Sequence, residues 1–246
     1  MMKINHLLTK INHGKNCQYS KHNKGFTLIE LLIAMFVGLI VLGATYAVFI
    51  AQNKELNKQE QIVVMQQNAR MAMEMMTREI MMAGYNQTTD PATIAAVPRC
   101  TNALVAAGTS CVGITSAGSN TIKFTADLNG SGSITPDDQF EGDNADENVA
   151  YDANLSLGIK SFRRNSKYTK SGSSYQPVVE YVDSLSFEYY DDANNTLLSP
   201  VILADICRIQ ITVTTRTANI DPNTGNYHYY PLKSYVTPRN LGITGY

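Results

Sequence analysis

Residues 31–51 read LLIAMFVGLIVLGATYAVFIA and contain no charged side chain. As an α-helix these 21 residues span about 30 Å, which is the thickness of the hydrocarbon core of a bilayer. A cleaved secretory signal has a shorter apolar run that ends at a small-residue cleavage site, whereas here a polar helical pattern follows directly. The stretch therefore predicts a retained membrane-spanning helix.

Charge on the two sides of this helix predicts its orientation. Residues 1–25 contain five lysines and no acidic residue. Subtracting these five from the 20 basic residues of the chain leaves 15, against 21 acidic ones. The positive-inside rule then places the N-terminus in the cytoplasm and the body on the other side of the membrane. The net charge of −1 gives no global basic field of the kind that attracts nucleic acid.

One acidic residue, Glu30, interrupts the apolar sequence just before residues 31–51. An unpaired carboxylate within the bilayer costs about 2.5 kcal/mol or more. Glu30 therefore lies at the membrane interface or has a partner.

The segment Lys24–Glu30, KGFTLIE, resembles the type III signal of type IV prepilins. The resemblance implies that a prepilin peptidase cuts after Gly25 and that the new N-terminal residue, Phe26, is N-methylated. Residues 1–25 are then a cleaved basic leader. Glu30 lies one helical turn after Phe26, so in a filament it can pair with the Phe26 ammonium of a neighbouring subunit. Such a pair would set the register of assembly.

The helix is predicted to continue beyond the membrane, over residues 26–84 in all. From Gln52 to Ala83 the sequence has neither Pro nor Gly and is rich in good helix formers. One apolar stripe recurs at spacings of three and four: Ile62, Met65, Ala69, Met73, Met76, Ile80 and Ala83. Gly84 supplies a C-terminal stop. Half of the methionines in residues 71–82 are expected to face the body as core and the rest to pack on neighbouring subunits, in preference to a soft-metal or promiscuous binding surface.

A second resemblance covers the end of this helix and the C-terminus. Residues 67–72 (QNARMA), 77–85 (TREIMMAGY) and 238–241 (PRNL) are similar to PilW-type minor pilins of type IV pili, whereas residues 86–175 are poorly covered. The resemblance implies a structural subunit that assists pilus assembly initiation or tip formation. Its implied partners are other major and minor pilins, the prepilin peptidase and the pilus assembly platform. The implied location is the inner membrane before assembly and the periplasmic or extracellular pilus afterwards.

The body, residues 85–246, changes to Thr, Ser, Gly, Asn and Asp with β-rich runs between turns. Strands are predicted at 121–125, 149–151, 157–163, 178–190, 206–216 and 227–236. Together with the long helix they predict an α+β fold, in which that helix packs on an antiparallel sheet. This is the lollipop shape of pilins.

Cysteine placement agrees with an oxidising compartment. Cys100 and Cys111 bracket a loop of ten residues, and a disulfide there would contribute about 2–3 kcal/mol by the loop-entropy model. The alternative is two free thiols. Cys207 is expected to be a buried small apolar side chain, and Cys17 leaves with the leader.

Residues 127–138 (DLNGSGSITPDD) follow the spacing of a calcium-binding loop. Oxygen ligands are predicted from Asp127, Asn129, Ser131, the Ser133 carbonyl and Asp138. Ser131 brings no charge and Asp138 is shorter than the usual Glu, so a bare acidic turn is the alternative to a structural Ca²⁺ site.

Two further functions compete with a structural one. The basic residues Lys160, Arg163, Arg164, Lys167 and Lys170 could bind DNA in a pilus-tip module for adhesion or DNA uptake, but the sequence favours a solvated hairpin that faces acidic neighbours. A minor pseudopilin of a type II secretion system is the other alternative. We expect no enzyme and no catalytic cofactor, because after cleavage His228 is the one histidine left and no Ser/His/Asp or Cys/His set is visible.

Overall fold

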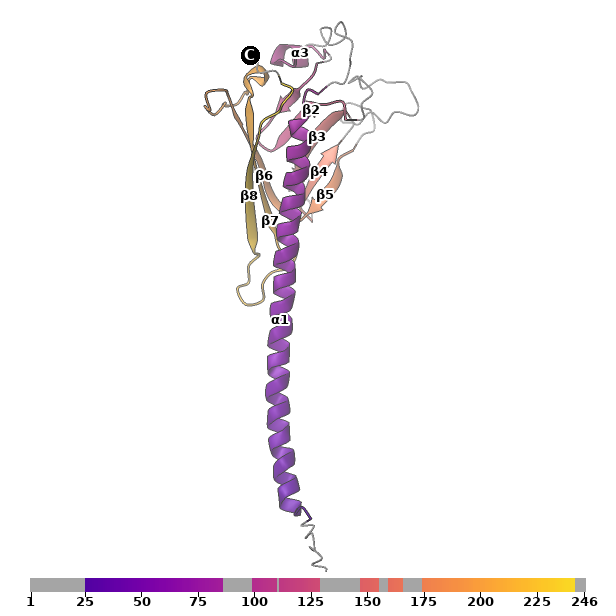
Figure 1. Cartoon of the computed structure of the whole chain (residues 1–246), viewed down its shortest axis with the longest axis vertical. Coiled ribbons are helices and arrows are strands. Elements are labelled where there is room, and N and C mark those ends of the chain that lie inside the picture. The colour runs from indigo at the N-terminus through magenta and orange to yellow at the C-terminus, as the bar shows by residue number, and fades with distance from the viewer. Residues whose placement is uncertain are drawn as a thin grey trace, which may run out of the picture. The chain divides into compact units, whose positions relative to one another are not determined.

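The computed structural model describes residues 25–85, 99–109, 111–128, 147–154, 159–165 and 174–241. These residues contain helices α1 (Leu28–Met81) and α3 (Asn102–Ala106), the 3₁₀ turn η1 (Leu203–Asp205), and strands β1 (Ile114–Ala117), β2 (Thr121–Thr125), β3 (Asn148–Asn154), β4 (Ser161–Asn165), β5 (Gln176–Glu180), β6 (Val182–Tyr190), β7 (Arg208–Arg216) and β8 (Tyr229–Val236) (Figure 1). The chain divides into two compact units, residues 1–53 and 54–246.

In the N-terminal unit, α1 has no protein cover. Its large apolar side chains are all exposed, from 83% for Leu28 to 38% for Ile50. A helix that is apolar on every side and covered by nothing in its own chain is suited to lipid. Among the described residues, α1 is the helix long and apolar enough to cross a membrane.

The α1 helix is shorter than the predicted 26–84 by two residues at its start and by three at its end. At its start, the side chain of Thr27 bonds to the first turn, so the helix begins at Leu28. At its end, Met82 and Ala83 donate to the carbonyls three residues back, which tightens the last turn. Gly84 then adopts φ +81° and donates its N–H to the Thr125 carbonyl, so the chain leaves the helix axis.

The described residues of the C-terminal unit form two antiparallel sheets where the sequence predicts one. One sheet has the order β1-β2-β3-β4-β5 and the other the order β6-β7-β8. The predicted strand 178–190 is divided at Tyr181, whose φ of 60° interrupts the extended backbone. The residues before it join the first sheet as β5 and those after it join the second as β6.

The end of α1 from Met65 onward, together with the turn up to Ala83, supplies the core between these sheets. One apolar cluster contains buried residues from α1, from the β2-β3-β4 region and from β6-β7-β8. Figure 1 shows the helix between the two groups of strands. The predicted stripe is buried from Met65 to Ala83, whereas Ile62 is half-buried and Ala72 joins the stripe. The methionines divide as expected: Met73 and Met76 are core, and Met71 is 54% exposed.

A polar contact fixes α1 against the first sheet. The Glu79 carboxylate accepts hydrogen bonds from the Arg164 Nε at 2.9 Å and from the Tyr151 hydroxyl. Tyr151 is fully buried, and burial together with the Glu79 charge raises the pKa of Tyr151. The side chains of Arg164 and Glu79 are 20% and 18% exposed, so this ion pair is largely shielded from water.

Replacing Arg164 by Ala is expected to lower the free energy of unfolding by about 2 kcal/mol, because Glu79 would remain as an uncompensated, mostly buried charge. Arg78→Ala is the matched control. Its partner Glu74 and Arg78 itself are both 71% exposed, so the loss should stay below about 0.5 kcal/mol. Urea unfolding of the full chain in detergent micelles measures both variants. Equal losses would contradict a structural role for the Arg164–Glu79 pair.

Candidate functional site

The segment that precedes α1 is open to solvent. Gly25, Phe26 and Thr27 form no regular structure and are exposed, with Phe26 at 88%. A Cβ built on Gly25 would meet no atom within 4 Å. The fold of this chain therefore does not require glycine at position 25, and the bond between Gly25 and Phe26 is accessible to another protein.

Thr27 and Glu30 form a reciprocal capping box at the start of α1. The Glu30 Oε2 accepts from the backbone N–H of Thr27 at 2.9 Å and from its hydroxyl at 3.0 Å. The Glu30 N–H donates back to the Thr27 hydroxyl at 3.3 Å. The sequence analysis missed this pair, although the signal was present as Thr-x-x-Glu. Glu30 therefore has local hydrogen-bond donors before any second subunit is present.

The two cysteines of the predicted pair are bonded. Cys100 and Cys111 form a disulfide with a Cα–Cα distance of 4.9 Å, which closes the loop that holds α3. Cys207 is a free thiol directly before β7. It is half-buried where full burial was expected, and burial raises the pKa of its thiol, which disfavours the reactive thiolate.

Of the predicted calcium ligands, Asp127 lies in the described part of the chain and is 1% exposed. The others, Asn129, Ser131, Ser133 and Asp138, lie outside the described residues. Glu147, which was not among the predicted ligands, is also buried, and its carbonyl accepts from the N–H of Ala126 at 2.9 Å. Two acidic residues are thus buried at neighbouring ends of β2 and β3. Within the described residues, no three His, Cys, Asp or Glu side chains are grouped as a metal site.

The described part of the basic cluster faces acidic partners. Lys160 pairs with Asp183 at 2.7 Å, and Arg163 makes two hydrogen bonds to the Asp152 carboxylate, at 2.9 and 2.6 Å. Arg164 pairs with Glu79 of α1. Lys167 and Lys170 lie outside the described residues. The three described cations are therefore already engaged, as expected for a hairpin that faces acidic neighbours.

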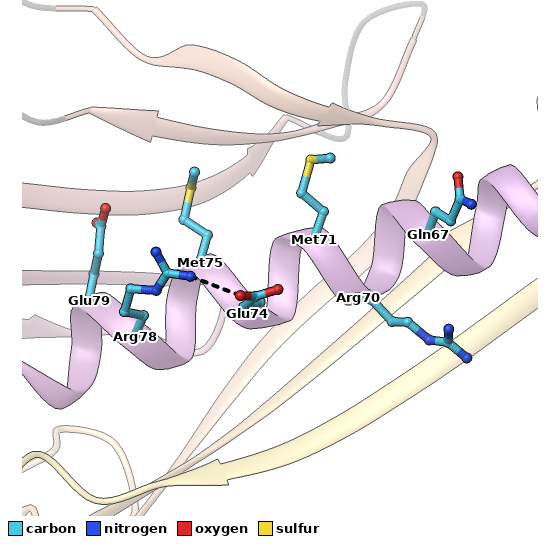
Figure 2. A pocket seen from close by; sticks show the side chains of 7 residues that line it. All are labelled: Gln67, Arg70, Met71, Glu74, Met75, Arg78 and Glu79. Carbon is cyan, nitrogen blue, oxygen red and sulfur yellow. Dashed lines mark hydrogen bonds and ion pairs between the residues drawn. The ribbon is translucent and has the colours of Figure 1, made fainter.

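An open groove of about 470 Å³ runs along the uncovered face of α1 (Figure 2). The Arg78 and Glu74 side chains are paired at 2.8 Å, and Met71 and Met75 project from the same side of the helix. This face carries the methionine that remains outside the core, where contact with neighbouring subunits was predicted. The groove is lined by Gln67, Arg70, Met71, Glu74, Met75, Arg78 and Glu79.

His228 falls within the predicted strand 227–236, but in the structure it precedes β8. Its side chain contacts a buried carboxylate. Its Nε2 lies 2.9 Å from the Asp221 Oδ2, and the Lys58 Nζ lies 3.1 Å from the same oxygen. The Asp221 side chain is 1% exposed. The N–H of Asn223, then His228 and Lys58, hold the pKa of Asp221 well below its usual range. This network joins two distant parts of the sequence, so no local pattern reveals it.

Comparison with known proteins identifies the N-terminal segment. Residues 20–46 match the family model of the prokaryotic N-terminal methylation motif. No curated protein matches the chain. Among solved structures, a type IV-like pilin from Thermus thermophilus aligns with a TM-score of 0.39 and 10% identity, over 72% of this chain and 98% of that chain.

These observations define the architecture of the protein: a long N-terminal helix packs on antiparallel sheets, and the start of the chain carries an N-terminal methylation motif. More particularly, the chain carries the prepilin-type N-terminal motif at residues 20–46, which confirms the predicted resemblance to type IV prepilins.

Proposed function

We propose that this protein is a minor pilin of a type IV pilus, a structural subunit that assists assembly initiation or tip formation. One observation carries the proposal: the methylation motif leads directly into α1, whose first half is apolar and uncovered and whose second half is the core of the body. Such a helix suits a subunit that waits in the inner membrane and then packs among other major and minor pilins. The prepilin peptidase and the pilus assembly platform would handle it between these states.

A contact between the two segments that resemble PilW-type minor pilins supports that subtype. The N–H of Arg239, near the C-terminus, donates to the Met81 carbonyl at the end of α1 at 3.1 Å. A Cβ on Gly84 would lie 3.1 Å from the Asn240 carbonyl oxygen, at a φ of +81°. Glycine is therefore needed where the C-terminal segment closes over the helix end. The two similar segments are parts of one packed junction.

Deleting the gene in the host is expected to reduce the number of pili per cell, because an initiating subunit limits how many filaments start. The protein should be present in sheared fibres in far smaller amount than the major pilin. Electron microscopy and quantitative immunoblotting measure the two quantities. Normal piliation together with loss of protein secretion would contradict the proposal and favour a minor pseudopilin of a type II secretion system.

We also propose that the chain is cut between Gly25 and Phe26 and methylated on Phe26, and that Glu30 then pairs with the Phe26 ammonium of a neighbouring subunit. The exposed Gly25–Phe26 bond supports the first part. The capping box supports the second, because it holds the Glu30 carboxylate beside the start of the mature chain.

Glu30→Gln and Glu30→Leu separate the charge of Glu30 from its capping function. Glutamine can complete a capping box, whereas leucine cannot. We expect both variants to enter the membrane and to begin at N-methyl-Phe26, as mass spectrometry would show, and both to be depleted from sheared fibres, because pairing with an ammonium requires the carboxylate. Normal recovery of Glu30→Gln in fibres, with loss of Glu30→Leu alone, would mean that the helix cap matters and the charge does not.

A structural Ca²⁺ site built on Asp127, Asn129, Ser131, the Ser133 carbonyl and Asp138 is a further proposal. The position of Asp127 supports it, because this predicted ligand is buried just after β2, where the predicted calcium loop begins. Few charged ligands in the loop suggest a dissociation constant on the order of 10⁻⁴ M.

Calcium at about 100 times that dissociation constant should stabilise the full chain by about 2.7 kcal/mol. We expect Ca²⁺ to raise the melting temperature of the wild type, Mg²⁺ to raise it less, and Asp127→Asn to abolish the calcium response. Asp192→Asn, an exposed acidic residue, is the control and should respond as the wild type does. An equal response to both ions, or one that survives Asp127→Asn, would indicate a bare acidic turn.

A further inference from the structure

A small cavity lies in the C-terminal unit, between α1 and the end of β7. Its volume is about 180 Å³, which gives room for about six water-sized groups. Val64 and Met65 line it from α1, Ala218 lines it from the segment after β7, and Arg216, the last residue of β7, supplies a cation. Val64 is 45% exposed and Met65 is 4% exposed, so the cavity extends from the surface towards the core.

The backbone at Arg216 is fixed by α1 and by the corner between β5 and β6. The Thr215 hydroxyl donates to the Met65 carbonyl at 2.9 Å. The N–H of Arg216 donates to the Tyr181 carbonyl at 2.9 Å, and Tyr181 also lines the cavity. The φ of Tyr181 is 60°, a conformation that residues other than glycine rarely adopt. The packing of the unit itself therefore sets the walls of the cavity.

The side chain of Arg216 has unused hydrogen-bonding capacity. A guanidinium carries five N–H donors. The Arg216 Nε is buried and has no hydrogen-bond acceptor among the described residues. None of the ion pairs formed within this part of the chain includes Arg216. A buried donor without an acceptor costs free energy, and a bound group that accepts from it is one explanation for its presence.

The aromatic contact of Arg216 is compatible with such a bound group. The guanidinium carbon lies 4.0 Å from the centroid of the Tyr227 ring, so the ring covers one flat face of the guanidinium. A carboxylate binds a guanidinium in its plane, at the edge, through two parallel hydrogen bonds. Stacking on Tyr227 and binding of a carboxylate therefore use different parts of the same side chain.

Arg208, at the other end of β7, shows what distinguishes Arg216. Its Nε is also buried without an acceptor in the part of the chain that the structure describes. Its guanidinium lies over two rings, those of Tyr190 and Tyr235, at 5.0 and 4.9 Å, and it does not line the cavity. Of the two arginines, Arg216 alone combines an unused donor with a place in a cavity wall.

We propose that this cavity binds the carboxylate of a short-chain acid. The Arg216 guanidinium donates two hydrogen bonds to the carboxylate, and the carbon chain lies against Val64, Met65 and Ala218. Glu60 lines the cavity as well, but it is exposed, so water screens its charge more than that of the partly buried Arg216. A free acid and a glutamate side chain of another protein offer the same chemistry. The site lies within the C-terminal unit, so the proposal does not depend on the assembly role proposed above.

Butyrate is the probe for a free acid, and butyramide is its neutral counterpart of similar shape. A pentapeptide with blocked ends and a central glutamate, and the same peptide with glutamine, test the side chain as the source. Binding to the full chain in detergent micelles is followed by saturation-transfer NMR of each ligand. We expect butyrate to bind with a dissociation constant on the order of 10⁻³ M, as suits so small a ligand, and butyramide to bind at least about tenfold more weakly.

Two pairs of variants locate the binding. Arg216→Gln removes the guanidinium and should weaken butyrate binding at least about tenfold, whereas Arg208→Gln should leave it unchanged. Val64→Phe fills the cavity from an exposed helix position and should abolish binding. Val63→Phe, at a neighbouring position that is 50% exposed and does not line the cavity, should bind as the wild type does. Circular dichroism checks the fold, and the valine pair keeps the test decisive if Arg216→Gln fails to fold.

The outcomes separate the two sources and the two proposals. Binding of butyrate supports a site for a free acid, and binding of the glutamate peptide but not its glutamine form supports an acidic side chain as the ligand. Equal binding of butyrate and butyramide would overturn the proposal, because the cavity would then not recognise charge. Butyrate binding that survives Arg216→Gln or Val64→Phe in a folded variant, or that Arg208→Gln weakens as much, would also overturn it, as would a wild type that binds neither butyrate nor the glutamate peptide. Pilus number and fibre content, which test the assembly role, are unaffected by any of these results.

Discussion

The burial of one stripe of α1 between two sheets is the interaction on which the body depends. Met76 and Ile80 are fully buried and belong to a single cluster with Phe124 and Tyr151 of one sheet and Ile211 of the other. Each sheet has an apolar face that must be covered, and the three-stranded sheet is too small to bury much surface alone. Because one helix covers both faces, the two sheets share a core. The Glu79–Arg164 contact then fixes the position of the helix along it.

The two parts of the same helix suit different surroundings, and their side chains differ accordingly. Residues 31–51 are apolar on every side, which suits lipid, whereas residues 65–83 have one buried stripe and polar residues elsewhere. A carboxylate near the start of the lipid-suited part has to be compensated. The capping box does this within the monomer by directing the Thr27 donors at Glu30. The carboxylate is thereby kept near the residue that becomes the N-terminus in the proposed mature chain.

The sequence pattern predicted the elements that depend on residues near one another in the chain. The bounds of β2, Thr121–Thr125, agree with the predicted strand, and the helix stripe is buried nearly as expected. The division at Tyr181 was missed because it follows from pairing with different sheets, since the Tyr181 carbonyl accepts from the N–H of Arg216. Gln210 alternates with Ile209 and Ile211 in the sequence, a pattern that by itself indicates a solvent-facing side chain, but it is 3% exposed. Its cover comes from neighbouring strands, where it bonds to Glu188 and accepts from the Tyr190 hydroxyl, so its own strand pattern gives no sign of burial.

The network around Asp221 was beyond prediction for a similar reason. Lys58 and Asp221 are more than 160 positions apart in the sequence, and their contact exists because α1 packs beside the end of β7, where the Thr215 hydroxyl donates to the Met65 carbonyl. The core packing thus brings a polar loop to Lys58 and Gln61 of α1. Polar contacts hold the loop there, because Lys58 and Gln61 of the helix bind it at two points while the Asp221 carboxylate accepts a hydrogen bond from within the loop.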